Sequence, residues 1–372
     1  MSKILIFIII LWSTFLFANF QQSIENSNFT MSDGNKEHFN YNRLRYKVNY
    51  KQDDFFSTFI GDVVNYWGED YISSLSFDYL KKIHADTAFK IQTNFYEYGK
   101  GVSYGKVYRF YGGYEDEFNR VLIGLQNITM GVGRFWQPTN LFNPINIYAL
   151  EPDEVFGVFA LNYTIHLNDM SDLRFVVSQK EDESLKYALS YKAFLSILDL
   201  GVDVIFSEDT QMFGIELEGN LGDTGIEIRT EGIYINSEFR TQQYNDLIVQ
   251  TTKDFFQGII GADYGFQNGI TVVLEGKYTS KTVIPDEISL NQNLEIISIL
   301  TPSSFYLASS LSYNFNLFLG GTLLYIDSFE GSEQFISPSF TYTINDYHSL
   351  SLGGFMQESK DNRYYFKYLL SF

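Results

Sequence analysis

The charged residues around one proline-rich segment are the best candidates for chemistry in this sequence. They could line two sides of a narrow passage, with Arg109, Arg120 and Arg134 facing Glu151, Asp153 and Glu154. Opposed charges across a passage set up a transverse field that orients dipolar solutes and filters them. The same side chains could instead form salt bridges that pin a plug. The sequence leaves both interpretations open.

A second charged group lies on either side of the turn at Gly222-Asp223. Its members alternate with apolar residues, as they would in two β-strands: Glu216, Glu218, Glu227, Arg229 and Glu231. If these side chains lined the inside of a barrel, they would form an acidic wall that favours cations. The alternative is a solvated face whose charge is partly balanced by the arginine.

The sequence offers no convincing catalytic set. Its four histidines are scattered, and the nearest pairing, His348 with Ser349, places adjacent residues on opposite faces of a strand. Gly131 and Gly133 lack the following helix that a phosphate-binding loop requires. The absence of cysteine excludes disulfides and thiolate metal sites. We therefore expect no enzymatic activity, no cofactor and no metal.

Apolar and polar residues alternate through most of residues 39–372, which is the pattern of β-strands. Arg43 and Arg45, for example, share one face, whereas Leu44 and Tyr46 share the other. Because these segments are separated alternately by short turns and longer loops, we expect an all-β, antiparallel up-and-down barrel. About 16–18 strands of roughly ten residues fit the chain, with the apolar face toward lipid and the polar face toward a wet lumen.

The connections between the expected strands are of two kinds. Tight turns are predicted at Asn168-Asp169, Gly222-Asp223, Gln267-Asn268-Gly269 and Asn345-Asp346, and longer polar loops near residues 236–253, 281–302 and 327–333. Residues 86–96 alternate acceptably as a strand. Residues 69–84 are ambiguous and could be strand, loop or an insert in the lumen.

The composition supports a membrane barrel. The chain is 45% hydrophobic and 18% aromatic, with 28 Tyr and 35 Phe, which suits lipid-facing strands and interfacial aromatic belts. Its formal net charge of −19 would repel nucleic acid, so we expect no nucleic-acid partner. Acidic external loops could bind divalent cations beside lipopolysaccharide phosphates, or the charge could merely keep a precursor soluble.

The amino-terminal residues predict export from the cytoplasm. Lys3 precedes an apolar run that ends at Ala18, as in a secretory signal peptide cleaved after residue 18. Residues 19–38 are polar and rich in Asn and Ser, which predicts a loose periplasmic arm before the barrel.

A proline-rich segment interrupts the alternation in the middle of the chain. Pro138, Pro144 and Pro152 are incompatible with regular strand pairing over this stretch. Apolar residues give the segment an anchor of its own: Trp136, Leu141, Phe142 and Ile145. We therefore expect an ordered loop between two barrel strands, lying either over the mouth of the barrel or inside its lumen.

The carboxy-terminal strand has a recognisable signature. Its apolar face consists of Tyr364, Phe366, Tyr368, Leu370 and the terminal Phe372. Such a strand resembles the closing strand of Gram-negative outer-membrane β-barrels. The resemblance implies an outer-membrane location and recognition of this strand by the barrel-assembly machinery.

The segment around Arg134 resembles a strand-and-loop pattern of porin-like outer-membrane proteins of proteobacteria. The matching positions are Gly124, Gln126, Gly131, Gly133, Arg134, Pro138, Thr139, Asn143 and Pro144. The chain departs from the pattern at Leu125, where Arg is usual, and at Asn140 and Asn146, where Asp is common.

The resemblance implies a channel for passive diffusion of small hydrophilic solutes, with selectivity at the 134–154 loop. It also implies outer-membrane lipid and lipopolysaccharide as surroundings, and a monomer or homo-trimer. A substrate-specific uptake barrel and a closed structural or adhesive barrel are the alternatives. Steady ion conductance, conductance blocked by a solute, and no conductance would distinguish the three.

Overall fold

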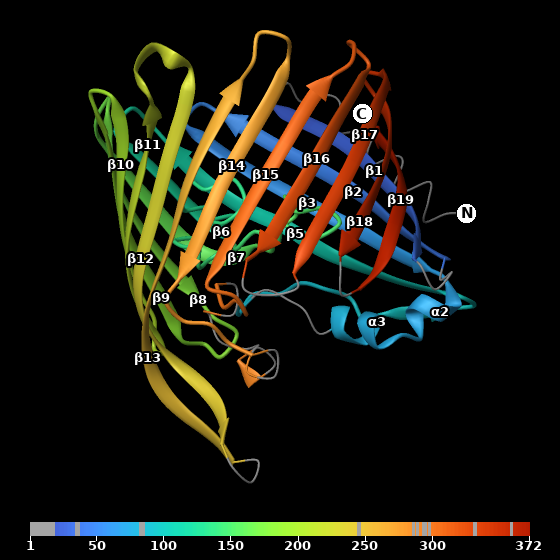
Figure 1. Cartoon of the computed structure of the whole chain (residues 1–372), viewed down its shortest axis with the longest axis horizontal. Coiled ribbons are helices and arrows are strands. Elements are labelled where there is room, and N and C mark those ends of the chain that lie inside the picture. The colour runs from blue at the N-terminus through green and yellow to red at the C-terminus, as the bar shows by residue number, and fades with distance from the viewer. Residues whose placement is uncertain are drawn as a thin grey trace.

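The computed structural model describes residues 19–33, 38–81, 86–243, 247–284, 287, 290, 291, 296, 299–329, 333–357 and 360–372. The signal peptide expected over residues 1–18 lies outside this part of the chain. The described residues form a closed antiparallel β-barrel with two short helices at one end (Figure 1).

The first half of the chain contributes β1 (Phe20–Asp33), β2 (His38–Gln52), β3 (Phe55–Trp67), α2 (Glu69–Ile72), α3 (Leu75–Leu80), β4 (Tyr96–Tyr98), β5 (Gly101–Glu115), β6 (Asn119–Gln126), β7 (Val158–Asn168) and β8 (Ser171–Gln179). The second half contributes β9 (Leu185–Leu195), β10 (Leu198–Phe206), β11 (Thr210–Asn220), β12 (Ile226–Gln243), β13 (Leu247–Gly265), β14 (Ile270–Thr279), β15 (Phe305–Asn314), β16 (Leu319–Ser328), β17 (Gln334–Asn345), β18 (His348–Gln357) and β19 (Lys360–Ser371). None of the described helices is long and apolar enough to cross a membrane.

Eighteen of these strands form the wall of the barrel. Each pairs with its neighbours in sequence, β3 pairs directly with β5, and β1 closes the ring against β19. The remaining strand, β4, covers only three residues on an edge of β5. The predicted all-β fold and the upper end of the predicted strand number are confirmed.

The first strand corrects one prediction. Phe20–Asp33 pair with β2 on one side and with β19 on the other, so this stretch is barrel wall and not a loose arm. The sequence concealed the strand because Asn26, Asn28, Thr30 and Ser32 are polar on the face where other strands carry apolar residues. Its backbone satisfies two strand edges that would otherwise remain open.

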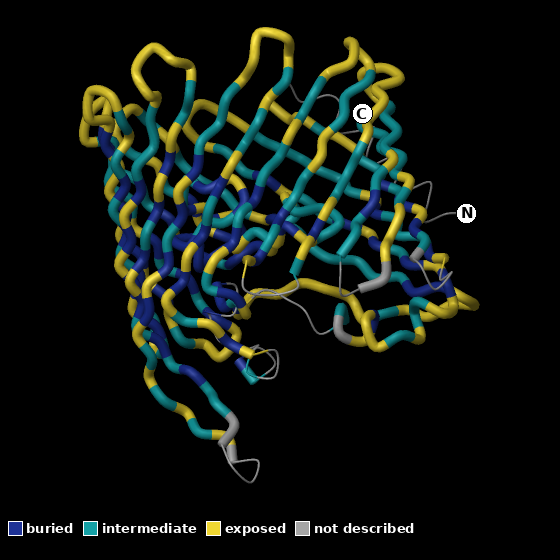
Figure 2. The backbone as a smooth tube through the Cα atoms, in the orientation of Figure 1, coloured by how far each residue is buried: buried dark blue, intermediate teal, exposed yellow. Residues whose placement is uncertain are grey.

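The two faces of the wall have opposite character. On β9 the outward-facing Leu185, Tyr187 and Leu189 are exposed, whereas the inward-facing Lys186 and Ser190 are buried. The same alternation of exposed and buried positions runs along the strands in Figure 2. This arrangement is the reverse of a soluble domain and is typical of barrels that are surrounded by lipid.

The two ends of the barrel differ in the length of their connections. The carboxy-terminal residue meets β1 at the end with the short turns, where Phe372 and Ile24 exchange backbone hydrogen bonds of 2.9 and 3.1 Å. The four predicted tight turns are confirmed there. At the opposite end, the polar stretch 236–253 does not form the predicted loop. Most of it extends β12 and β13 into a hairpin that projects beyond the rest of the wall (Figure 1).

The strand β6 is too short to pair with the whole edge of β5, and another segment of the chain pairs with the remainder. β6 is only eight residues long, and after Gln126 the chain turns into the lumen. The free edge of β5 is then covered by residues 91–98, with Thr93 N–H bonded to the carbonyl of Gly105 and Val107 N–H to that of Ile91, both at 2.9 Å. The strand predicted over 86–96 is therefore mostly irregular, because it substitutes for the missing half of β6. The ambiguous stretch 69–84 contains α2 and α3.

Deletion of Phe372 should strongly reduce assembly, because it removes both hydrogen bonds to Ile24 and the ring that stacks on Tyr347 with centroids 5.6 Å apart. The folded, heat-modifiable fraction in outer membranes measures the effect on gels. Phe372→Tyr, which keeps the backbone and an aromatic ring, is the matched control. Wild-type amounts of folded truncated chain in the membrane would remove the terminal residue from the assembly signal.

Candidate functional site

The proline-rich loop, residues 127–157 between β6 and β7, lies inside the lumen. The side chain of Arg174 on β8 bonds the carbonyl of Thr129 at 3.1 Å, and Lys186 on β9 bonds that of Leu141 at 3.0 Å. On another part of the wall, Ser27 on β1 contacts the loop carboxylate of Glu151 at 3.2 Å. Since these partners come from separated, inward-facing strand positions, the loop crosses the barrel interior and does not cover its mouth.

Three wall carboxylates hold the first part of this loop, and we call Glu216, Glu231 and Glu275 the loop clasp. They accept hydrogen bonds from six consecutive backbone N–H groups, those of residues 131–136. Glu216 accepts from residue 131 at 2.6 Å, and Glu231 accepts from residues 132 and 133 at 3.0 and 3.4 Å. Glu275 accepts from residues 134, 135 and 136 at 2.8, 3.1 and 2.9 Å. Charged acceptors make such bonds stronger than neutral ones.

The two glycines of this segment make the clasp possible. Gly131 has a φ of 90°, which residues with a side chain rarely adopt, and a Cβ there would lie 2.7 Å from a carboxylate oxygen of Glu231. At Gly133 a Cβ would overlap the carbonyl oxygen of Trp136. The Gly-Val-Gly pattern is thus required by a close approach of backbone to carboxylates.

A second tether, of reversed polarity, holds the end of the loop to β2. Here the loop supplies the carboxylates: Glu151 pairs with Arg43 at 3.0 Å, and Glu154 pairs with Arg43 at 2.9 Å and with Arg45 at 2.7 Å. Lys367 on β19 adds a contact of 3.3 Å to Glu151. The loop is therefore fixed at two well-separated parts of the wall.

The Glu154 tether should resist moderate acid. Burial alone would raise the pKa of Glu154, but the hydrogen bonds and charges of Arg45 and Arg43 outweigh it and lower the pKa from its ordinary 4.5 to about 2. The stabilisation is complete above the ordinary value and is lost as pH falls through the lowered one. We expect the contribution of this tether to channel conductance to be the same at pH 7 and pH 5, and to fail only near pH 2.

Planar-bilayer conductance of wild type and Glu154→Gln at both pH values is the measurement. The substitution should mimic protonation and change the conductance even at pH 7. A Gln variant that conducts like wild type would show that this ion pair does not position the loop.

Apolar loop residues fill other parts of the lumen. Phe135 packs against Ile326 and Phe335 of the β15–β17 wall, and the ring of Trp136 lies 6.0 Å from that of Tyr306. Four further loop residues pack against inward-facing apolar side chains of β7–β13 in a second buried cluster. They are Ile128, Met130, Leu141 and Phe142. These contacts fill the lumen against β15–β17 and against one end of β7–β13, and polar side chains line the rest of β5–β9.

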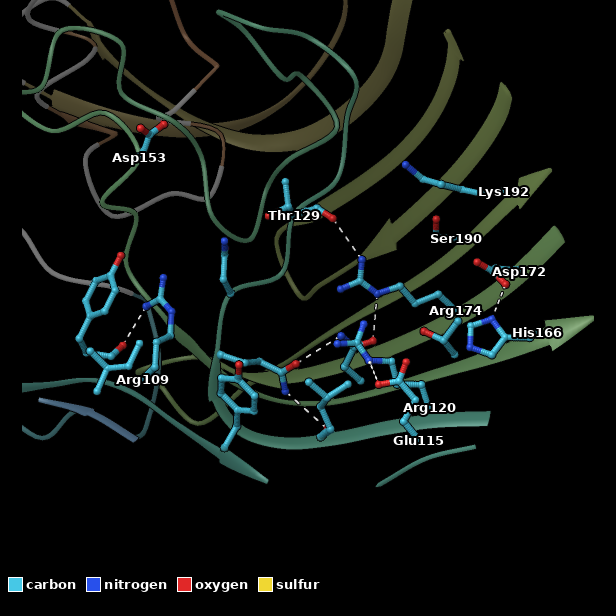
Figure 3. Close-up of a pocket in the computed structure, with 18 residues that line it drawn as sticks. Arg109, Glu115, Arg120, Thr129, Asp153, His166, Asp172, Arg174, Ser190 and Lys192 are labelled. Atoms are coloured by element: carbon cyan, nitrogen blue, oxygen red, sulfur yellow. Dashed lines mark hydrogen bonds and ion pairs between the residues drawn. The ribbon is translucent and has the colours of Figure 1, made fainter. Parts of the chain in front are cut away.

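A polar cavity of about 680 Å³ lies between the loop and the β5–β9 wall (Figure 3). Its lining contains four basic side chains, Arg109, Arg120, Arg174 and Lys192, and three carboxylates, Glu115, Asp153 and Asp172. In a chain with a net charge of −19, this is a local excess of cations. His166 also lines the cavity and contacts Asp172 at 2.7 Å.

The basic side chains of the cavity differ in availability. Arg109 is buried, bonds the loop carbonyl of Val155 at 2.7 Å and lies over the ring of Tyr108. Arg174 is bonded to Asn162 at 2.9 Å as well as to the loop. Arg120 has a single, longer ion pair, 3.4 Å to Glu115, and its side chain is 45% exposed. The side chain of Lys192 is 49% exposed, but it forms a close ion pair of 2.8 Å with Glu216. Arg120 is therefore the exposed cation of the cavity with the weakest ion pair.

The structure separates the charges that the sequence placed in one constriction. Arg109, Arg120 and Asp153 do meet in the cavity. Arg134 instead contacts Glu218, Glu227 and Asp263 at 3.5, 2.5 and 3.2 Å. The predicted partners of Arg134, Glu151 and Glu154, belong to the tether on β2, because the loop is held at both ends by wall residues.

The predicted acidic wall likewise has two parts. Glu216 and Glu231 belong to the loop clasp, whereas Glu218 and Glu227 contact Arg229 and Arg134. The sequence interpretation missed the wall partners of the loop: Arg43, Arg45, Arg174, Lys186, Glu275 and Lys367. Their alternation marked them as inward-facing, but their partners are far away in sequence.

Within the described ranges, no three His, Cys, Asp or Glu side chains are arranged to hold a metal ion.

No protein-family model matches the sequence, and no curated protein sequence matches it. Solved structures with a similar fold do exist. Acinetobacter baumannii OccAB1 has a TM-score of 0.60 at 10% identity, with 95% of this chain and 96% of that chain covered. Pseudomonas aeruginosa OccK5 (OpdH) has a TM-score of 0.59 at 9% identity, covering 95% and 97%. P. aeruginosa OpdK, solved with vanillate, has a TM-score of 0.55 at 10% identity, covering 95% and 99%.

These similarities extend over nearly the whole of each chain, at sequence identities of 9–10%. They agree with the wall of eighteen strands and with the expectation drawn from the carboxy-terminal strand. The chain therefore has the barrel fold of these outer-membrane proteins.

Proposed function

We propose that the protein is an outer-membrane channel of a Gram-negative bacterium, through which small hydrophilic solutes diffuse passively. The observation that carries the proposal is a loop fixed inside the lumen at two parts of the wall, beside a polar cavity. A loop held in this way narrows the barrel and leaves a path along β5–β9. The function requires no catalytic step.

The outer surface supports the location. Outward positions on most strands carry large apolar side chains, such as Leu161 on β7, Leu189 on β9 and Leu352 on β18. Such a surface is stable only against lipid or another apolar surface. Polar groups face the lumen, where water and hydrophilic solutes are accommodated.

A second candidate, substrate-specific uptake, is favoured by the charge of the cavity. Arg120 and Arg174 can bind a carboxylate through paired N–H groups, which neutral sugars or cations would not exploit. OpdK, which shares the fold, was solved with vanillate. We therefore propose that the channel prefers small organic anions.

Planar-bilayer recording of the purified barrel tests both the channel function and the preference for small organic anions. Steady conductance that small aromatic or aliphatic carboxylates block at micromolar to millimolar concentration would support an anion-preferring channel. Conductance unaffected by any of them would leave a general pore. A correctly folded barrel that conducts almost no current would refute the channel and favour a closed structural barrel.

A further inference from the structure

One part of the outer surface does not match the rest. Five asparagines face outward on β1, β2 and β3, and we call them the amide patch: Asn26, Asn28, Asn40, Asn42 and Asn65. Thr30 and Ser32 continue the same face of β1 toward the loop end of the barrel.

Strand register shows that the patch faces away from the lumen. Ser27, Phe29 and Met31 of β1 are buried, and Ser27 contacts the lumenal loop at Glu151. Because side chains alternate along a strand, Asn26 and Asn28 must lie on the outer face.

The patch lies within the apolar belt and not above it. The outward residues of β1 stand opposite the apolar face of the last strand, with Asn26 paired to Leu370 and Asn28 to Tyr368. Further along, Thr30 stands opposite Phe366. On the other side, Asn42 pairs with Asn65, whose strand also presents the exposed Val63 and Trp67. Lipid chains around these paired residues can neither donate nor accept a hydrogen bond.

The asparagines satisfy one another only in part. Asn26 and Asn42 exchange side-chain hydrogen bonds at 3.2 Å, and Asn40 donates to Asn28 at 3.0 Å. Each amide has two N–H donors and a carbonyl with two lone pairs. In the described contacts, Asn42 donates one hydrogen bond and Asn28 one long bond of 3.5 Å. Asn26 also donates to the carbonyl of Arg43 at 3.3 Å and Asn40 to that of Phe29 at 2.8 Å, and Asn65 accepts from the hydroxyl of Tyr98. The donors and acceptors that remain for a partner are therefore mainly those of Asn28 and Asn42.

We propose that the amide patch is a contact surface for a second copy of this chain in the plane of the membrane. The inference rests on the barrel being embedded in lipid but is independent of the solute. An amide surface is its own complement, because each group donates and accepts, so an identical patch related by symmetry satisfies it. Interchain hydrogen bonds of this kind stabilise association in membranes.

The charge of the surface argues against a lipid headgroup as the occupant. Phosphate and carboxylate headgroups are bound by lysine and arginine. No lysine or arginine occupies an outward position among the described residues of β1–β3, since the four basic residues, Arg43, Arg45, Lys47 and Lys51, all share the inward face of β2. A neutral amide partner fits the patch and an anionic lipid does not.

The absence of cysteine allows a direct test by disulfide cross-linking in native membranes. Thr30→Cys, exposed at the edge of the patch, should give a covalent pair of barrels after mild oxidation. Leu189→Cys, equally outward but on β9, is the matched control and should give far less. Equal yields from the two positions would overturn the proposal.

A second measurement remains informative if the cysteine variants assemble poorly. The double variant Asn28→Leu, Asn42→Leu should shift the full-length barrel, extracted in mild detergent, toward monomer in mass measurements. Its single-channel conductance should remain that of wild type, which separates this result from a failure of the channel proposal. An unchanged mass, or loss of bound lipopolysaccharide in place of a subunit, would overturn the inference.

Discussion

Replacing Glu275 with alanine should release the Arg134–Trp136 segment and make the channel larger and noisier. Three backbone N–H groups lose their only described acceptor, and each buried N–H left unsatisfied costs about 1–3 kcal/mol. The segment should therefore leave the wall and sample several positions. Single-channel recording should show a raised mean conductance with slow fluctuations between levels.

Two substitutions separate the clasp from a simple change of charge. Glu275→Gln keeps a carbonyl oxygen that can accept from Phe135 and Trp136, so it should have a much smaller effect. Glu227→Gln removes the same charge from a lumenal carboxylate that accepts from the side chains of Arg229 and the loop residue Arg134, but from no backbone N–H group of the loop. Its conductance should stay close to wild type. If Glu275→Ala had the mean conductance of wild type without slow fluctuations, the loop clasp would not position the loop.

Replacing Arg120 with glutamate should shift the ion selectivity of the channel strongly toward cations. The substitution changes the charge of the cavity by two units at the exposed cation with the weakest ion pair. Because rings of charged side chains determine which ions enter a narrow pore, the reversal potential in a potassium chloride gradient should move toward that of potassium.

The controls for this second prediction test location and charge separately. Arg120→Gln should give an intermediate reversal potential. Lys100→Glu makes the same charge change outside the cavity, at the turn before β5, and should leave selectivity unaltered. If Arg120→Glu and Lys100→Glu gave the same reversal potential, the conducting path would not pass Arg120.

Much of the barrel wall was predictable because its signal is local. Alternation over a few residues, as in Arg43–Tyr46, fixes both the strand and the face that points inward. Short turns such as Asn345-Asp346 are fixed by the residues they contain. The exceptions have physical causes. β1 was missed because polar residues occupy much of the face that is apolar on other strands, and residues 236–253 were taken for a loop because β12 and β13 continue beyond the apolar belt.

The interior was less predictable because its contacts join distant parts of the chain. Arg134 and Glu275 are 141 residues apart, and Arg45 and Glu154 are 109 apart. Local patterns identified the loop and its charges, but the pairing depends on which strands face one another across the barrel. The sequence could therefore not show that the charges would divide between a clasp, a tether and a cavity.

Solutes should pass through the polar cavity beside the loop, and one pair of cysteine substitutions can locate this path. Thr164 lines the cavity, whereas its neighbour Ile165 points to the outer face of β7. A charged, thiol-specific methanethiosulfonate reagent should reduce the conductance of Thr164→Cys and leave that of Ile165→Cys unchanged. Unaltered conductance in Thr164→Cys, with its thiol shown to be labelled, would contradict the account.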